Sequence, residues 1–358
     1  MPEIKEYPCP NCGGQLTFDS SLQKMKCTSC DSTFEVEDAE SYAKCKNQED
    51  DLTWNREDET FSDNDNLSVF TCKSCGGEIL QEKDDISSSC PYCGNAIVNT
   101  GKVTGVLKPD LFIPFKYNKK EAKEKYISHV KSKKIVPHNF LDENHIDEIK
   151  GIYVPFWLYD ADVDADVTFT AIKTRSHRDG DYMVTETDHY LLVRSGSLSF
   201  EKVPVDASVK IDDVLMQSIE PYDIKEAVDF NTAYIAGYQA EKYSKEIDET
   251  ESDANRRIVR STVDAFKETT VNYEMVNVAT SSVRTKNGNA HYALLPVWIL
   301  NTHYKGKDYI FAMNAQTGKF IGDLPADTGL AIGLFFKTFL STSFVTALLV
   351  TLYIWLVK

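Results

Sequence analysis

The sequence predicts a multidomain protein with two small cysteine-rich β ribbons, an α+β middle region with antiparallel strands, and one C-terminal transmembrane helix. Three observations support this prediction: the spacing of eight cysteines, mixed helical and strand-like patterns after residue 101, and an uncharged apolar run near the end of the 358-residue chain. We expect ribbons at residues 1–36 and 71–100, an acidic linker at 37–70, the α+β domain at 101–327 and the membrane helix at 329–357.

Eight of the nine cysteines form two sets with the same spacing, C-x2-C-x14-C-x2-C, and the second set follows the first by 63 residues. Gly-Gly follows the first pair of each set. Two CxxC pairs about fifteen residues apart are typical of a tetrahedral zinc site with four thiolate ligands. The sequence therefore predicts two zinc ribbons in tandem, each with one Zn2+. The predicted ligands are Cys9, Cys12, Cys27, Cys30, Cys72, Cys75, Cys90 and Cys93.

Other cysteine chemistry fits the pattern less well. Disulfides need an oxidising compartment, and Met1–Pro10 contains charged residues without the apolar core of a signal peptide. A redox CxxC normally occurs singly after a strand, and the exact duplication favours zinc over an iron–sulfur cluster. Because four thiolates leave no open position for substrate or water, we interpret both sites as structural. Cys45 has no partner in this scheme and is interpreted as a free thiol.

The charge of the chain argues against a nucleic-acid ligand for the ribbons. The formal net charge is −16, and residues 1–101 hold 8 Lys and Arg against 20 Asp and Glu, a net of −12. Nucleic-acid affinity comes mostly from Lys and Arg that neutralise phosphates, so this region would be repelled. Protein–protein recognition is the better prediction for the ribbons.

A long apolar run predicts a membrane anchor. Thr338–Val357 contains twenty residues without a charge, and at 1.5 Å per residue such a helix spans about 30 Å, the hydrocarbon thickness of a bilayer. Gly329–Phe336 extends the run, and Lys337 can extend its ammonium group to the headgroups. We expect a single-pass, tail-anchored protein of the cell membrane with a cytoplasmic N-terminus, and only Lys358 beyond the membrane.

The middle of the chain alternates helical and strand-like patterns. Asn118–Lys134 is predicted as a helix because Ala122, Tyr126 and Val130 recur at helical spacing. Its lysine-rich surface could meet anionic lipid or nucleic acid, although a solvated helix face is the favoured interpretation. Further helices are predicted at 38–46, 208–217 and 248–269, the last capped by Ser252. Strands are predicted at 151–159, 161–173, 182–194, 198–205, 271–285, 292–304, 308–314 and 320–322.

Two further patterns concern packing and internal symmetry. Trp54 and Phe61 are expected to pack on a ribbon, because they interrupt an otherwise polar linker. Val154-Pro155-Phe156-Trp157-Leu158 resembles Leu295-Pro296-Val297-Trp298-Ile299 at an offset of 141 residues, and each segment follows a predicted helix. The α+β domain is therefore interpreted as a possible duplication, with coincidental strand-edge prolines as the alternative.

The sequence contains no catalytic motif. The histidines form no HExxH, and there is no GxxxxGK[ST], GxGxxG or GxSxG sequence. Asp160, Asp162, Asp164 and Asp166 alternate along one predicted strand, which could bind a hard cation, but a solvated strand face is favoured because an EF-hand glycine and terminal glutamate are missing. We expect no enzyme activity and no small-molecule substrate.

Several longer phrases resemble a known family. YPCPNCGG…KCTSC and TCKSCGGEI…CPYCGN, followed by GIYVPFWLYDADV, VPVDAS, AYIAGYQAEKY and LLPVWIL, are similar to TFIIB-type zinc-ribbon membrane proteins of Gram-positive bacteria. The resemblance covers nearly the whole chain. It implies a C-terminally membrane-anchored adaptor in an envelope-stress assembly, beside phage-shock protein A and a flotillin-like protein. It implies no catalytic residues, so only the eight cysteines carry over.

The sequence leaves two functions in competition. One is a membrane-anchored zinc-binding scaffold that recruits a cytoplasmic protein to the membrane. The alternative is a membrane-tethered nucleic-acid-binding regulator that uses the basic helix at 118–134. The acidic ribbon region favours the scaffold, with a protein partner and no nucleic acid.

Overall fold

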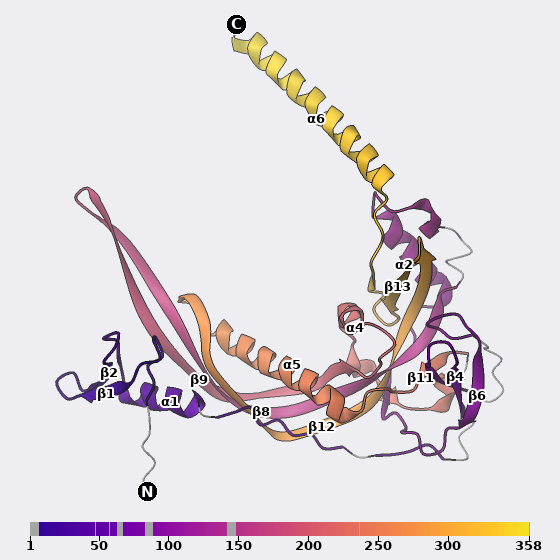
Figure 1. Ribbon diagram of the computed structural model, residues 1–358, viewed down its shortest axis with the longest axis horizontal. Coiled ribbons are helices and arrows are strands. Elements are labelled where there is room, and N and C mark those ends of the chain that lie inside the picture. The colour runs from indigo at the N-terminus through magenta and orange to yellow at the C-terminus, as the bar shows by residue number, and fades with distance from the viewer. Residues whose placement is uncertain are drawn as a thin grey trace. The chain divides into compact units, whose positions relative to one another are not determined.

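The computed structural model describes residues 7–46, 48–56, 58–62, 67–82, 89–141, 148–235 and 237–357. The chain divides into two compact units, each assembled from separate segments. Unit 1 contains Met1–Glu57, Trp157–Val205 and Glu246–His291, and unit 2 contains the rest. Residues 101–327, which were predicted as one domain, contribute to both units, and boundaries between the units fall within or at the ends of the long strands drawn in Figure 1.

The first ribbon is a small antiparallel sheet in unit 1. Its strands are β1 (Leu16–Asp19), β2 (Lys24–Cys27) and β3 (Thr33–Phe34), with β2 in the centre. Its core is small, formed by Cys9, Leu16, Met25, Cys27 and Ala39. Helix α1 (Val36–Lys46) follows directly, so the segment predicted as a linker begins with a helix, as expected near residues 38–46.

The body of unit 1 is a sheet covered by one helix. Strand β8 (Lys150–Asp179) pairs with β9 (Tyr182–Asp206) and with β12 (Glu274–Tyr304). Helix α5 (Ile247–Glu268) packs on it, because Ala254 and Ile258 form its buried stripe. Both strands of the β8–β9 hairpin continue beyond the core into an arm, residues 174–189, in which only Val184 is even partly buried.

The structure corrects several predicted boundaries in unit 1. Each of β8, β9 and β12 is one continuous strand where two were predicted, and Asn287-Gly288 lies within β12 and forms no turn. The N-cap of α5 is Glu246 and not Ser252, because the side chain of Glu249 accepts a hydrogen bond from Glu246 N at 2.8 Å. Short sequence windows favour turns at glycine, but pairing along a neighbouring strand keeps these strands extended.

Unit 2 joins the second ribbon to the short strands of the middle region. Strand β4 (Leu67–Cys72) pairs with β5 (Glu78–Glu82) and β6 (Ile97–Lys102), and β5 pairs with β11 (Gln239–Glu241). Strand β7 (Leu111–Phe112) lies between β10 (Val228–Asp229) and β12, and β13 (Lys307–Asn314) lies between β12 and β14 (Phe320–Gly322). The short helices are α4 (Asp213–Ile219), η1 (His138–Leu141), η2 (Ile224–Glu226) and η3 (Thr232–Tyr234).

Helix α2 (Lys119–Lys131) supplies part of the core of unit 2. It begins at a capping box, in which Asn118 Oδ1 accepts from Glu121 N at 3.0 Å and Glu121 accepts from Asn118 N at 2.8 Å. Ala122, Tyr126 and Val130 are buried, as their spacing predicts. They pack in one cluster with side chains from η1 and from β12 to β14, including Phe140, Trp298, Phe311 and Met313.

The two aromatic residues of the predicted linker contact side chains of the middle region. Trp54 in unit 1 contacts the ring of Tyr159 edge-on at 4.7 Å and donates to Asn255 Oδ1 at 2.9 Å. Phe61 in unit 2 is buried and lies against Phe230. The prediction was wrong for Trp54, which packs with side chains of β8 and α5, because the linker pairs with β12 beside them.

The repeated proline motif makes matching contacts within unit 2. Pro155 O accepts a hydrogen bond from Ala207 N, and Pro296 O accepts one from Ala315 N, both at 3.0 Å. Ala207 O then accepts from the residues just before α5, and Ala315 O accepts from those just before α2. The donors are Ser244 N and Lys245 N in the first case, and Lys116 N and Tyr117 N in the second.

The strands next to these motifs match as well. Phe112 of β7 pairs in parallel with Leu294 of β12, and Ala240 of β11 pairs in parallel with Tyr153 of β8. In each case a helix N-cap with a capping box follows the short strand, at Asn118 or at Glu246. These matching contacts are expected for a duplicated unit. The short strand of each copy pairs with the long strand of the other copy: β7 with β12, and β11 with β8.

Candidate metal centres

The eight predicted ligands form two groups of four cysteines. Within each group the sulfur atoms all lie within 4.8 Å of one another. The closest pairs are Cys9 with Cys30 at 3.7 Å and Cys12 with Cys27 at 3.5 Å; in the second group, Cys72–Cys93 is 3.5 Å and Cys75–Cys90 is 3.6 Å. Four sulfurs about 2.3 Å from a central ion in a tetrahedron are separated by about 3.8 Å, whereas a disulfide needs about 2.05 Å. Both groups therefore fit a tetrahedral metal ion.

Tight backbone turns point these cysteines inward. In the first turn Cys9 N donates to Gly14 O at 2.6 Å and Gly13 N donates to Cys9 O at 2.8 Å, with Gly13 at φ 73°. The first turn of the second group repeats both bonds around Gly76, which has φ 71°. Glycine adopts this conformation without a steric cost, which explains the Gly-Gly that follows each first pair.

The thiols of each group have pKa values shifted in opposite directions. Burial raises the pKa of Cys90 above its usual range. Burial also acts on Cys93, but hydrogen bonds from Asn95 lower the pKa of that thiol to about 6. In the first group hydrogen bonds lower the pKa of Cys30 to about 6, and burial raises that of Cys9 to about 12. A bound cation is what would hold all four sulfurs as thiolates at neutral pH.

The second group has positive charge at its turns. Lys210 Nζ donates to Cys75 O at 2.7 Å, and Lys150 Nζ donates to Cys90 O and Ser89 Oγ, both at 2.9 Å. Four thiolates and one divalent ion carry a net charge of about −2. Two ammonium groups that bind the carbonyls of Cys75 and Cys90 therefore favour the metal-loaded site. Sequence reasoning missed both lysines, because they lie more than fifty residues from the cysteines that they contact.

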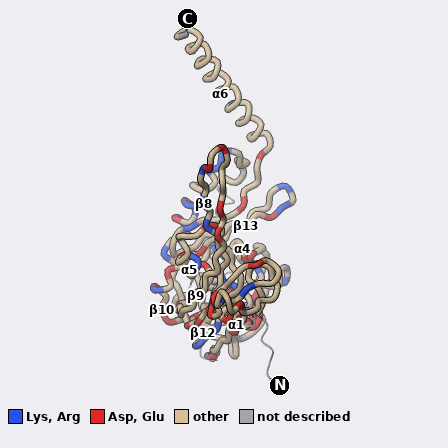
Figure 2. Tube along the Cα trace, turned by 90° about the vertical axis from the view of Figure 1, so that its left-hand side faces the viewer, with Lys and Arg blue, Asp and Glu red and all other residues tan. Residues whose placement is uncertain are grey.

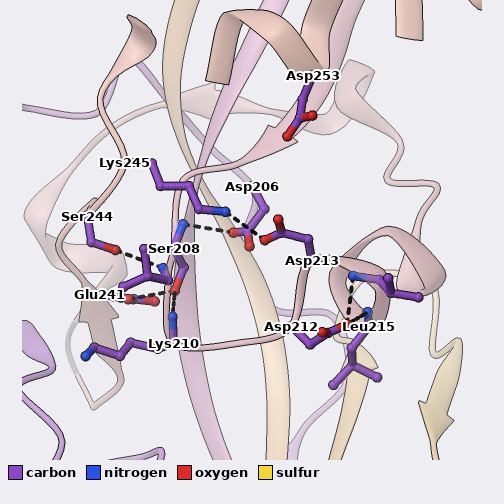
Figure 3. A network of polar contacts seen from close by, with 12 residues as sticks. Asp206, Ser208, Lys210, Asp212, Asp213, Leu215, Glu241, Ser244, Lys245 and Asp253 are labelled. Carbon is purple, nitrogen blue, oxygen red and sulfur yellow. Dashed lines mark hydrogen bonds and ion pairs between the residues drawn. The ribbon is translucent and has the colours of Figure 1, made fainter. Parts of the chain in front are cut away.

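A buried polar network in unit 2 contains Asp206, Ser208 and Glu241 (Figure 3), and Tyr92 of the second ribbon joins it. Glu241 is 1% exposed and accepts hydrogen bonds from the Tyr92 hydroxyl and from Ser208 Oγ. Asp206 is 5% exposed; its Oδ1 accepts from Ser208 N at 3.1 Å, and its Oδ2 has no hydrogen-bond partner among the described residues. Burial raises the pKa of Glu241 to about 7 and the pKa of Asp206 to about 8. Because Glu241 has two donors, Asp206 is the carboxyl that keeps its proton at neutral pH.

The alternating aspartates of β8 pair with neighbouring side chains in unit 1. Asp164 and Asp166 form ion pairs with Lys286 at 2.9 Å and Arg284 at 2.8 Å. Burial raises the pKa of Asp160, but hydrogen bonds from His291 and Lys202 outweigh it and hold the pKa at about 2. This face is thus a row of cross-strand pairs, where an openly solvated face was predicted.

Helix α6 (Thr328–Val357) is long and apolar enough to span a membrane. None of its most apolar stretch is buried against the rest of the chain, and Figure 2 shows a helix almost without charged residues. The predicted start at residue 329 agrees to within one residue, and Lys358 lies outside the described residues.

Cys45 belongs to neither metal group; its thiol donates to Asp166 O at 3.1 Å.

No family model and no solved structure matches this chain. It is 35% identical over 329 residues to the uncharacterized protein YdjG of Bacillus subtilis (strain 168), a match that covers 91% of this chain and 92% of YdjG. Identity at this level over nearly the full length of both proteins shows common descent, and the chain therefore belongs to the same protein family as YdjG.

Proposed function

We propose that this protein is a membrane-anchored, zinc-binding scaffold that recruits a cytoplasmic protein to the membrane in an envelope-stress response. The observation on which this rests is α6, an apolar helix whose most apolar stretch is not buried against the rest of the chain. An unburied helix of this composition is costly in water and stable in a bilayer. The folded units would then be held at the cytoplasmic surface, where their reduced cysteines are stable.

Zinc is the proposed metal of both centres. Four thiolates at tetrahedral spacing suit Zn2+, and they leave no open coordination position for water or substrate. The lysines at the second centre further favour a permanently occupied site. Metal analysis of the purified protein tests this assignment: two zinc ions per chain are expected, whereas iron with visible charge-transfer absorbance would contradict it.

The β8–β9 arm is the proposed partner-binding element of unit 1. Residues 174–189 form a two-stranded hairpin beyond the core, and such a hairpin gains stability when it is covered. At its turn Tyr182 is 78% exposed and Met183 is 71% exposed. Adjacent exposed aromatic and methionine side chains are typical of protein-binding surfaces. A phage-shock protein A-like or flotillin-like protein is the proposed partner, on the basis of the sequence resemblance.

Two variants separate anchoring from recruitment. Deletion of Gly329–Lys358 should leave this protein and its partner in the cytosol, with unchanged zinc content. Tyr182→Ser combined with Met183→Ser should keep the protein in the membrane but release the partner, as measured by affinity purification from solubilised membranes. Val271→Ser is the matched control, since Val271 in unit 1 is 81% exposed and lies outside the arm.

The scaffold proposal fails if the truncated protein still sediments with membranes, or if no protein relocates with it. Recovery of nucleic acid in place of a protein, lost when the lysines of α2 are replaced, would favour the membrane-tethered regulator.

A further inference from the structure

The chain enters α6 directly beside the C-terminal end of α2. Asp327 N donates to Ile135 O at 2.7 Å, and Asp327 Oδ1 accepts from Leu330 N at 2.9 Å in the first turn of α6. Leu324 packs in the same apolar cluster as Val136. These contacts all lie in unit 2, and they fix the end of α2 next to the start of the apolar helix (Figure 1).

The end of α2 is basic and exposed. Residues 125–141 contain four lysines and no Asp or Glu, and the nearest acidic residues in the sequence are Glu124 and Asp142. Lys131, Lys133 and Lys134 are exposed, and within the described ranges no carboxylate forms an ion pair with any of them. The acidic groups on the entering chain are Asp323 and Asp327, and the latter is engaged in capping α6. Among the described residues, these three lysines are therefore available to bind an anion.

A second basic pair belongs to the same part of unit 2. The ring of Phe140 in η1, which follows α2, contacts the rings of Tyr304 and Tyr309 at 5.3 and 5.7 Å. These tyrosines flank the β12–β13 turn, where Lys305 and Lys307 are exposed. The aromatic contacts hold the turn against the segment that follows α2. His303 and Asp308 near the turn pair with each other at 2.8 Å.

The length of α6 places this surface at headgroup depth. The apolar helix has 29 residues and is therefore about 44 Å long, the thickness of a bilayer with its headgroup layers. Its first residue, Thr328, directly follows Asp327 and would lie at the boundary between headgroups and water. Lys134 is the sequence neighbour of Ile135, whose carbonyl accepts from Asp327 N, so the lysines at the end of α2 would lie close to that boundary.

We propose that Lys131, Lys133 and Lys134, with Lys305 and Lys307, bind the headgroups of anionic phospholipids and so orient unit 2 on the membrane surface. The inference rests on the proposed membrane insertion of α6. Each lysine near an anionic surface contributes roughly a fivefold gain in binding. The apolar anchor fixes only the attachment point, whereas the headgroup contacts define which face of unit 2 meets the membrane.

The test uses the full chain in phosphatidylcholine nanodiscs with or without phosphatidylglycerol, and measures amide hydrogen exchange at residues 131–136. We expect exchange to slow roughly fivefold or more when the anionic lipid is present. Lys133→Glu combined with Lys134→Glu should abolish this slowing. Lys119→Glu combined with Lys120→Glu is the matched control, because these exposed lysines lie at the other end of α2, about 18 Å away along the helix, and should leave it intact.

Equal amide exchange rates in both lipid mixtures overturn the inference. Slower exchange that persists in the Lys133→Glu, Lys134→Glu variant also overturns it, because it would be a general effect of the charged membrane surface. Equal protection by an oligonucleotide in neutral nanodiscs would assign the lysines to nucleic acid and also overturn it. Alkaline extraction of cell membranes is measured in parallel. Loss of the protein into the alkaline supernatant refutes the anchor itself, separately from the lipid contact.

Discussion

Replacement of Asp206 by Asn should stabilise unit 2 at neutral pH and reduce its dependence on pH. The carboxyl is buried and one of its oxygens has no hydrogen-bond partner among the described residues, so the ionised form is disfavoured. Asparagine is a suitable replacement, because Asn314 occupies the matching position of the other repeat. Asn314 Oδ1 accepts from Gln316 N at 2.9 Å, just as Asp206 Oδ1 accepts from Ser208 N.

The size of the effect follows from the pKa difference between the folded and unfolded states. Burial raises the pKa of Asp206 from 3.8 to about 8. The stability that this carboxyl contributes is thus fully present below the unfolded value of 3.8 and is lost as the pH rises towards the folded value. Between these limits the free energy of unfolding falls by about 1.4 kcal/mol per pH unit. From pH ~6 to ~7.5 the wild type therefore loses about 2 kcal/mol of stability that the Asp206→Asn variant retains.

Denaturant unfolding of the zinc-loaded protein across this pH range measures the difference. Metal release on acidification acts on both proteins and therefore cancels in the comparison. Asp164→Asn is the control: hydrogen bonds from Ser197 and Lys286 lower the pKa of Asp164, so its contribution is lost only on acidification below 3.8 and adds no slope near neutrality. Parallel curves for the wild type and Asp206→Asn would refute the assignment of a buried, protonated Asp206.

The remaining predictions concern the metal centres and nucleic acid. Cys9→Ser with Cys12→Ser should reduce the zinc content from two ions to one, and Cys72→Ser with Cys75→Ser should remove the other ion; loss of both ions from either variant would contradict independent sites. Lys210→Met should speed zinc transfer from the second centre to a chelator by roughly tenfold, as loss of an outer-shell partner does, and leave the first centre unchanged. A fluorescence titration should show no duplex DNA binding by the wild type at physiological salt; submicromolar, salt-sensitive binding would overturn the charge argument.

The sequence determined the candidate metal ligands and the ends of several helices, because these features depend on short-range order. Each set of four cysteines spans 22 residues, and a residue with positive φ follows each CxxC turn: Gly13, Asp31, Gly76 or Gly94. The spacing that predicted the ligands is also the spacing that closes the sites. The same holds for α2, whose capping box and buried stripe lie within one helix. Composition alone was sufficient to predict α6, because a run of twenty uncharged residues indicates a helix of membrane-spanning length without any information on tertiary contacts.

Tertiary structure decided what local patterns could not. The Tyr92–Glu241 hydrogen bond joins residues 149 positions apart, and Lys210 reaches Cys75 across 135. Neither contact leaves a periodic trace in the sequence. In the sequence, Asp206 looks like an ordinary polar residue at the end of a strand. Only the fold shows that it is buried and that its pKa is raised. The sequence predicts that the lysines at the end of α2 form a solvated helix face. The hydrogen bond between Asp327 N and Ile135 O shows that this end of α2 lies beside the start of α6. Ligand spacing and apolar length are properties of a segment, whereas burial and charge environment depend on which distant segments pack against it.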